Sequence, residues 1–339
     1  MRKRFEAAKA VPVGGQAVLE GVMMRAPGMV ATAVRRASGE IVVQQDRHRS
    51  LGERFAAFRL PILRGALGLI EMLVIGMRTL NFSAEVAMRD AGFAVPKDGD
   101  GHNGKSSRSS RVADGLKLGL TLTISLAVGV AIFFVTPLFL ATTFFHVDQQ
   151  PLVFNGIAGV VRIGLLLAYL VGISMMKDIK RLFQYHGAEH KAVFAFEKGE
   201  ELTVAAAARQ SRFHPRCGTS FLLVVMILAM LLFSVLDAVV ILWTGHLTLA
   251  IRLLTHLPLI PFVGGISYEF IRASAKRSET LVGRIVVAPG LWLQKITTRE
   301  PDESMLEVAL VALKSALGRG ESVVSIPGGI ILQEPSAAG

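Results

Sequence analysis

Residues 220–243 read SFLLVVMILAMLLFSVLDAVVILW, and Asp237 is the only charged side chain among them. An α-helix rises about 1.5 Å per residue, so about 20 consecutive apolar residues are enough to cross the hydrocarbon of a bilayer. Three other stretches of the chain reach this length, at residues 116–145, 153–176 and 247–271. The sequence therefore predicts a mainly α-helical membrane protein with about four transmembrane helices.

The composition of the whole chain agrees with a membrane location. Of its 339 residues, 52% are hydrophobic and only 19% are charged, which exceeds the apolar content that a soluble core of this size needs. The formal net charge is +11, and Lys and Arg residues flank the apolar stretches. This placement favours the bilayer and its anionic lipid head groups as partners, and it disfavours nucleic acid.

The distribution of basic residues predicts which loops lie on the cytoplasmic side. The link before residue 153 contains Asp148 and no Lys or Arg, and the link around Gly245 and His246 carries no charged residue. Residues 177–219 and both tails are rich in Lys and Arg. By the positive-inside rule, both termini and residues 177–219 are predicted to be cytoplasmic in a multi-pass protein.

A fifth apolar stretch covers residues 60–80 but carries a polar stripe. Arg64, Glu71 and Arg78 are seven residues apart and so share one side of a helix. A crossing here would leave the basic residues that follow on the outer side. We therefore expect an amphipathic interfacial or re-entrant helix over residues 60–90.

The polar parts complete a division into five segments. Met29–Arg35 and Glu40–Gln45 flank Ser38-Gly39 and predict a β-hairpin, while Met305–Leu317 has helical spacing and Val323–Leu332 reads as a short strand or a tail. The predicted segments are residues 1–59 with the hairpin, 60–90 as the interfacial helix, 91–115 as a flexible linker, 116–272 as the four-span domain including residues 177–219, and 273–339 as the cytoplasmic C-terminal segment.

The strongest chemical motif is Tyr185–Lys191, YHGAEHK, within the predicted cytoplasmic segment. On a helix, His186, Glu189 and His190 share one face. Two imidazoles four residues apart can bind one zinc ion, and a carboxylate beside them can act as general base toward a water molecule, as in HxxEH sites. The alternative is a solvated amphipathic helix whose histidines pair with backbone or carboxylate groups.

A catalytic zinc ion usually takes a third protein ligand, and the same segment offers several. We expect His214 to be this ligand, with Glu197 as a further acidic candidate. Cys217 has three readings: a thiolate ligand, a nucleophile activated by His214, or a small apolar side chain at the start of the third span.

Charged residues also occur within the apolar stretches, where charge is costly and each such group is a functional candidate. They are Arg162, Asp237, Arg252, His256 and Glu269. Asp237 and Arg252 fall in the outer halves of the third and fourth spans, so we expect a structural ion pair rather than a transport pathway. Pro258, Pro261, Gly264 and Gly265 predict a kink or break in the fourth span.

Four strings taken together resemble the YqhQ-like family of bacterial membrane proteins, and the resemblance extends over nearly the whole chain to about Val323. The strings are Gly14–Arg25 (GGQAVLEGVMMR), Tyr185–Lys191 (YHGAEHK), His214–Phe221 (HPRCGTSF) and Thr297–Ala309 (TTREPDESMLEVA). The family is a domain of unknown function, described in general terms as a predicted metal-dependent enzyme. The resemblance implies a bacterial inner (plasma) membrane location and favours metal chemistry, but it names no substrate.

Two of these motifs bear on the site. The first adds Glu20 as an acidic candidate and Arg25 as an anion partner, beside a Gly-Gly pair that lets backbone approach a site closely; the alternative is a turn leading into the β-hairpin. In the last motif, Glu303 and Met305 stand where the family usually has Asp and Gln. No catalytic role is therefore carried over to Met305.

Two classes of function remain open from the sequence. The first is a metal-dependent hydrolase at the cytoplasmic membrane face, with Zn²⁺ or another divalent transition metal held by His186, His190 and His214, and with Glu189 as the catalytic group. The second is a non-enzymatic scaffold, insertion factor or small transporter in which the His/Glu cluster is structural.

Overall fold

The computed structural model describes residues 11–54, 58, 60–93, 119–121, 123–275, 280–319 and 331–332. Its chain forms two compact units, each assembled from separate parts of the sequence. The first unit comprises Met1–Ala94, Leu170–Val224 and Gly264–Gly339, and the second comprises Val95–Tyr169 and Val225–Val263. The predicted linker lies outside the described residues after Phe93, and the division into five segments stays a prediction.

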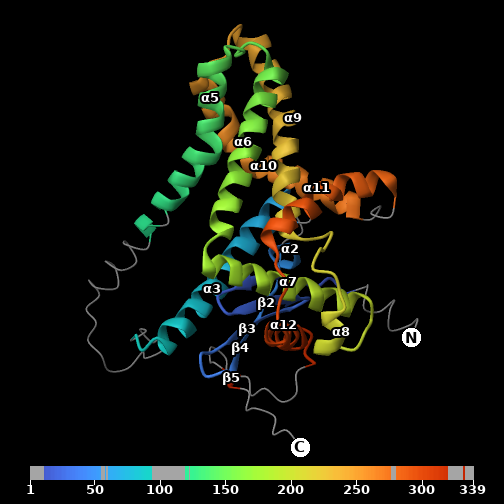
Figure 1. Ribbon diagram of the computed structural model, residues 1–339. Helices are drawn as coiled ribbons and strands as arrows, with labels where there is room; N and C mark the ends of the chain where they lie inside the picture. Colours follow the sequence, from blue (N-terminus) through green and yellow to red (C-terminus); the bar gives the residue numbers. More distant parts are fainter. Residues whose placement is uncertain are drawn as a thin grey trace, which may run out of the picture. The chain divides into compact units, whose positions relative to one another are not determined.

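An antiparallel sheet forms the centre of the first unit (Figure 1). Its strands are β1 (Gly14–Val18), β2 (Gly21–Ala26), β3 (Met29–Arg35), β4 (Ile41–Arg47) and β5 (Ile331–Leu332), paired in that order. The predicted hairpin is confirmed as β3 and β4, and Gly39 adopts a φ of 90° in its turn. The GGQAVLEGVMMR motif forms a second hairpin, β1 with β2, which the sequence patterns did not predict as strands.

Helices pack against both faces of this sheet. Because side chains alternate along a strand, Val22 and Met24 face α7 (Lys177–Glu197), α8 (Val204–Ala208) and α12 (Glu303–Ala316), with which they share one core. Met23 points to the other face and packs against Ile75 of α3 (Leu63–Asp90). The C-terminal helix is confirmed as α12, which begins where the Asp302 side chain accepts a hydrogen bond from the amide of Met305.

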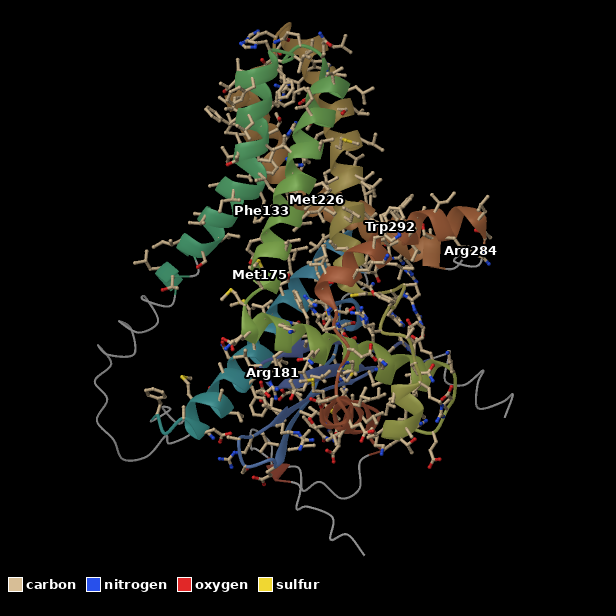
Figure 2. All side chains as sticks on the ribbon, viewed as in Figure 1. Phe133, Met175, Arg181, Met226, Arg284 and Trp292 are labelled. Atoms are coloured by element: carbon tan, nitrogen blue, oxygen red, sulfur yellow. The ribbon has the colours of Figure 1, made fainter. Side chains whose placement is uncertain are left out.

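The first unit contains two more helices: α2 (Leu51–Arg54) comes before α3 in the chain, and α11 (Leu281–Thr297) comes after the last apolar helix. α2 is short, and α11 begins where the Thr280 side chain accepts a hydrogen bond from the amide of Gly283. Leu281, Ile285 and Trp292 of α11 are exposed, whereas Leu293 is buried. Figure 2 labels Arg284 and Trp292 on this helix. α11 therefore has one exposed apolar side and one side that packs within the unit.

Four helices are long and apolar enough to cross a membrane, as the sequence predicts. They cover Gly119–Phe145, Pro151–Ser174, Phe221–Thr244 and Leu249–Ser274. The first contains η2 (Ala131–Val135) followed by α5 (Thr136–Phe145); the others belong to α6 (Pro151–Ser174), α9 (Gly218–Thr244) and α10 (Leu249–Ala275). α3 is not among these candidate spans, in agreement with its polar stripe.

The fourth span is not broken, because α10 continues through Pro258 and Pro261; the predicted kink stays a prediction. Gly265 serves close packing instead. A Cβ atom there would lie 2.4 Å from the backbone oxygen of Ile62, immediately before α3. The glycine thus allows α10 and the start of α3 to touch, which is a different use from the bend that the sequence predicts.

Candidate metal centre

The HxxEH motif lies on α7, and its side chains share one face of that helix as predicted. Cys217, the residue before α9, joins them. Nitrogen atoms of His186 and His190 and the sulfur of Cys217 all lie within 4.8 Å of one another. Two imidazole nitrogens and one thiol sulfur are donor types that suit Zn²⁺ and related transition metals.

Backbone carbonyl groups orient both histidine rings. His186 Nδ1 lies 2.8 Å from the oxygen of Thr297, and His190 Nδ1 lies 2.5 Å from the oxygen of Arg212. A carbonyl oxygen can only accept a hydrogen bond, so each Nδ1 carries the proton and each neutral ring keeps a lone pair on Nε2. Metal-binding histidines show this pattern, because the bond at one nitrogen fixes the other as a ligand.

The two Nε2 atoms have different partners in the structure. His186 Nε2 lies 3.2 Å from Cys217 Sγ. His190 Nε2 is buried and has no hydrogen-bond partner among the residues that the structure describes. Burial lowers the pKa of the His190 ring, although the nearby Cys217 and the Arg212 carbonyl act in the opposite direction. A buried acceptor without a donor is costly, and a metal ion would satisfy it.

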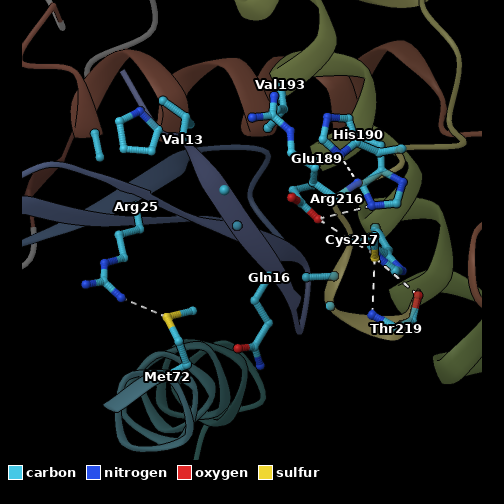
Figure 3. Close-up of a pocket in the computed structure, with 18 of the residues that line it drawn as sticks. Val13, Gln16, Arg25, Met72, Glu189, His190, Val193, Arg216, Cys217 and Thr219 are labelled. Atoms are coloured by element: carbon cyan, nitrogen blue, oxygen red, sulfur yellow. Dashed lines mark hydrogen bonds and ion pairs between the residues drawn. The ribbon is translucent and has the colours of Figure 1, made fainter. Parts of the chain in front are cut away.

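Glu189 lies beside His190 and close to Cys217 (Figure 3). Its Oε2 is 3.9 Å from Nε2 of His186 and 3.9 Å from Nε2 of His190. Burial raises the pKa of the carboxyl group, while the rings of His186 and His214 and a hydrogen bond from the Gly15 amide lower it. A Cβ atom on Gly15 would come within 2.9 Å of Glu189 Cγ, so the missing side chain of Gly15 permits this contact.

Cys217 is held at the beginning of α9 by hydrogen bonds to its sulfur. Thr219 donates its backbone N–H to Sγ at 3.4 Å, and the Thr219 hydroxyl lies 3.2 Å away. Metal ions bind the thiolate form of cysteine. Of the three readings left open by the sequence, the geometry favours Cys217 as a metal ligand, since its sulfur faces His186.

His214, the third ligand expected from the sequence, lies close by but outside the donor group. Its ring centroid is 5.6 Å from that of His190. Its Nδ1 accepts the N–H of Arg216 at 3.3 Å, and its Nε2 lies 3.3 Å from Glu197. Glu197 also pairs with Arg216. Because both ring nitrogens are engaged, the structure supports Cys217 over His214 as the third ligand.

Gln294 of α11 fixes the backbone of His214, a contact that no sequence motif indicated. Its Oε1 accepts the N–H of His214 at 2.8 Å, and its Nε2 donates to the His214 oxygen at 2.7 Å. Thr297 on the same helix supplies the carbonyl group for His186. Gly187 lets this region approach α7, because a Cβ atom there would lie 2.1 Å from the oxygen of Arg299.

A cavity of about 870 Å³ opens beside these groups. Its walls include His186, Glu189, His190 and Cys217, together with β1 residues Gly14 to Ala17. Figure 3 shows Val13 and Gln16 between Arg25 and Met72 on one side and Glu189, His190 and Cys217 on the other. The volume falls in the range of small-molecule sites.

The structure brings only one of the two candidates from the first motif into this cavity. Arg25 lines the wall, with Nη1 3.0 Å from Met72 Sδ and Nη2 3.7 Å from Glu71. Glu20 instead lies in the turn between β1 and β2, where it pairs with Arg181 and contacts the Tyr185 hydroxyl at 3.3 Å.

Glu269 pairs with Arg64, and neither residue is among those that line the cavity. This contact joins α10 to the start of α3 within the first unit. The geometry gives Glu269 an ion-pairing role between two helices.

The other four charged candidates from the apolar stretches lie in the second unit. Three of them, Asp237, Arg252 and His256, form one hydrogen-bonded network, and Arg162 makes a separate contact. Asp237 Oδ2 accepts hydrogen bonds from Arg252 Nε at 3.0 Å and from Asn155 Nδ2 at 2.7 Å, while His256 Nε2 lies 2.8 Å from Oδ1. Arg252 also reaches the Asp148 carboxylate at 3.0 Å. The predicted ion pair between Asp237 and Arg252 is confirmed.

Arg162 does not join that network. Its Nε donates to the backbone oxygen of Phe133 at 3.0 Å, and its guanidinium group lies 5.4 Å from the ring centroid of Phe134. This side chain therefore stabilises the contact between α6 and η2 through a backbone hydrogen bond and an aromatic contact.

The fold and this geometry define the chain as a membrane-type helical protein with a His/Cys group beside a sheet, in which His190 is buried and His186 and Cys217 are partly exposed. A family model described as a protein of unknown function (DUF1385) matches residues 60–319, and the chain belongs to this family. The uncharacterized protein YqhQ of Bacillus subtilis (strain 168) is 33% identical over 304 residues, which cover 90% of this chain and 92% of that protein. The resemblance stated from the motifs is thereby confirmed. No solved structure matches the chain.

Proposed function

We propose that this protein is a metal-dependent hydrolase whose metal ion is bound by His186, His190 and Cys217. One observation carries the proposal. Both histidines donate Nδ1–H to backbone carbonyl groups, which leaves Nε2 as the ligand atom of each ring, and one nitrogen of each ring and the Cys217 sulfur lie within 4.8 Å of one another. Three such donors leave a fourth coordination position for water or substrate, as in catalytic zinc sites.

Glu189 is the group we assign to proton transfer. The bound metal ion would supply Lewis acidity and a nucleophile at neutral pH. Glu189, 3.9 Å from each Nε2, is placed to accept the proton of the attacking water molecule and to return it to the leaving amine or alcohol. The bond between the carbonyl carbon and the leaving group breaks, and one water molecule is consumed.

Metal content is the first test. We expect about one equivalent of zinc or another transition metal in detergent-purified protein, by analogy with other three-ligand sites. Substituting His186→Ala together with His190→Ala should abolish it. In the Co²⁺-loaded protein, a thiolate-to-cobalt charge-transfer band should be present and should disappear in Cys217→Ser.

Two variants serve as controls for this test. His246→Ala removes an exposed histidine of the second unit and should leave the metal content unchanged. His214→Ala should retain the ion, because its ring nitrogens contact Arg216 and Glu197. Absence of metal from folded, monodisperse protein after divalent ions are added back would contradict the proposal and favour the scaffold, insertion-factor or transporter alternatives.

We further place the protein in the inner (plasma) membrane of a bacterium, with both termini and α7 on the cytoplasmic side. The Lys and Arg residues of 177–219 support this orientation. Exposed apolar side chains on α3, including Ile70, Leu73 and Val74, support an interfacial position for that helix near anionic lipid head groups.

Cysteine labelling tests the orientation. In a Cys217→Ala background, Gln150→Cys and Lys180→Cys each introduce a single exposed thiol. A membrane-impermeant maleimide added to intact cells should label Gln150→Cys and should label Lys180→Cys only after permeabilisation. The reverse pattern would contradict the proposed sidedness.

A further inference from the structure

Strand β1 is the edge of the sheet that faces the metal centre. It pairs with β2 on one side, and no strand among the described residues, which begin at Val11, pairs with its other side. The hairpin of β1 and β2 closes at Val18 and Gly21 around a two-residue turn, and Gly15 lies three residues before Val18. A two-residue hairpin is closed by a hydrogen-bonded pair, and pairs alternate along an antiparallel ladder, so the backbone N–H and C=O of Gly15 point away from β2. Because this direction repeats at every second residue of an antiparallel strand, Ala17 also points its N–H and C=O away from β2.

The cavity follows this edge of β1. Gly14, Gly15, Gln16 and Ala17 all line it. Gly14 is exposed, and a Cβ atom on it would meet nothing within 4 Å. The open side of the strand therefore presents backbone hydrogen-bonding groups next to Glu189, with little side-chain bulk in front of them.

An unpaired strand edge is a template for another extended chain. A lipid acyl chain would bring no partners for the outward N–H and C=O groups, whereas a peptide backbone supplies both at the same spacing. The cavity of about 870 Å³ is large enough for a short peptide segment.

We infer that the substrate is an extended peptide segment that binds as an added strand along β1, which places one of its peptide bonds beside Glu189. This inference rests on the proposed metal-dependent hydrolysis and names its substrate class. In the reaction, water adds to the carbonyl carbon and the C–N bond breaks. Glu189 passes the water's proton to the leaving nitrogen, so the products are a carboxylic acid and an amine.

Binding of metal-directed probes to the wild-type, metal-loaded protein tests the inference. The probes are acetohydroxamate, a four-residue peptide hydroxamate, and octanoyl hydroxamate. The peptide probe should bind at least about tenfold more tightly than acetohydroxamate, because each added backbone hydrogen bond is worth up to about a factor of ten. N-methylation of peptide amides that face β1 should cost about tenfold each, whereas N-methylation of the intervening amides should have no effect.

A variant of the strand provides the complementary measurement. Ala17→Pro removes the outward N–H, and proline is tolerated on an edge strand where that N–H faces outward. It should lower peptide hydroxamate affinity about tenfold and leave acetohydroxamate binding unchanged. Ala17→Ser keeps the N–H and should bind like the wild type. If Ala17→Pro does not fold, the affinities of the N-methylated peptide hydroxamates for the wild-type protein still test the inference.

Failure of the inference and failure of the proposed function are distinguishable. The peptide assignment alone would be overturned if the protein contains metal and binds acetohydroxamate, but binds the peptide hydroxamate no more tightly. The same holds if N-methylation lowers the affinity equally at all peptide amides. Tighter binding of octanoyl hydroxamate than of the peptide hydroxamate would overturn the peptide assignment in favour of an acyl substrate. Absence of both metal and acetohydroxamate binding would overturn the proposed function as well.

Discussion

Glu189→Gln should retain the full metal content of the wild type and should slow hydrolysis of an activated ester, 4-nitrophenyl acetate, by about 10²- to 10⁴-fold, the usual contribution of a general base. The metal is retained because the amide replaces a group that is 3.9 Å from the histidine nitrogens and is not one of the three donors. Only proton transfer is removed. Elemental analysis and initial rates on the same preparation measure the two effects together.

Glu200→Gln is the matched control for this substitution. Glu200 accepts a hydrogen bond from Gln210 at 3.0 Å and is not among the residues that line the cavity. Its replacement should change neither metal content nor rate. Equal hydrolysis rates for the wild type and Glu189→Gln, with metal present in both, would remove Glu189 from the chemistry.

Asp237→Asn should cost about 3 kcal/mol or more in the free energy of unfolding. Asp237 is fully buried and forms an ion pair with Arg252, which is also fully buried. Removing one partner of a buried ion pair typically costs about 3–5 kcal/mol. Arg252 would keep only the partly exposed Asp148 carboxylate and the Asp148 backbone oxygen as partners, so we expect the lower end of this range. Unfolding of the detergent-solubilised protein by SDS titration measures the loss.

Asp148→Asn tests how much the partly exposed ion pair of Arg252 contributes to stability, in comparison with the buried pair. The Asp148 carboxylate is 26% exposed, and the substitution does not remove the Asp148 backbone oxygen, which accepts a hydrogen bond from Arg252 at 2.6 Å. The expected loss is therefore about 1 kcal/mol or less, as for exposed ion pairs. If Asp237→Asn and Asp148→Asn lower the free energy of unfolding equally, burial does not determine how much each ion pair contributes to stability.

The long apolar helices were predictable because their signal is local. Residues 220–243 carry one charge, so length and composition alone identify the span, and the same holds for the hydrophobic periodicity of α12. The continuity of α10 was not predictable, because Pro258 and Pro261 resemble helix breakers. Gly265 meets α3, and only tertiary packing reveals that use.

The donor group was predictable in part. The spacing of His186, Glu189 and His190 places them on one helical face wherever α7 lies, so the sequence identified them. The choice between His214 and Cys217 depends on the chain path after α8, where His214 turns toward Glu197 and Cys217 turns toward His186.

The backbone parts of the site carried no sequence signal. The carbonyl groups of Thr297 and Arg212 and the amide of Gly15 orient or contact the central side chains, and a backbone group is present at every residue. Strand β1 was not predicted either, because it begins with Gly14 and Gly15 and glycine is uncommon within strands. Their small size instead serves the approach to Glu189.

The contact between His186 and Thr297 also sets an order of events during synthesis. The ribosome completes α6, α9 and α10 before it reaches Thr297, and the carbonyl group that fixes the His186 ring comes from that late residue. All three donors, His186, His190 and Cys217, are translated much earlier. A nascent chain thus acquires the carbonyl group that orients His186 only near the end of translation, after the apolar helices have been made.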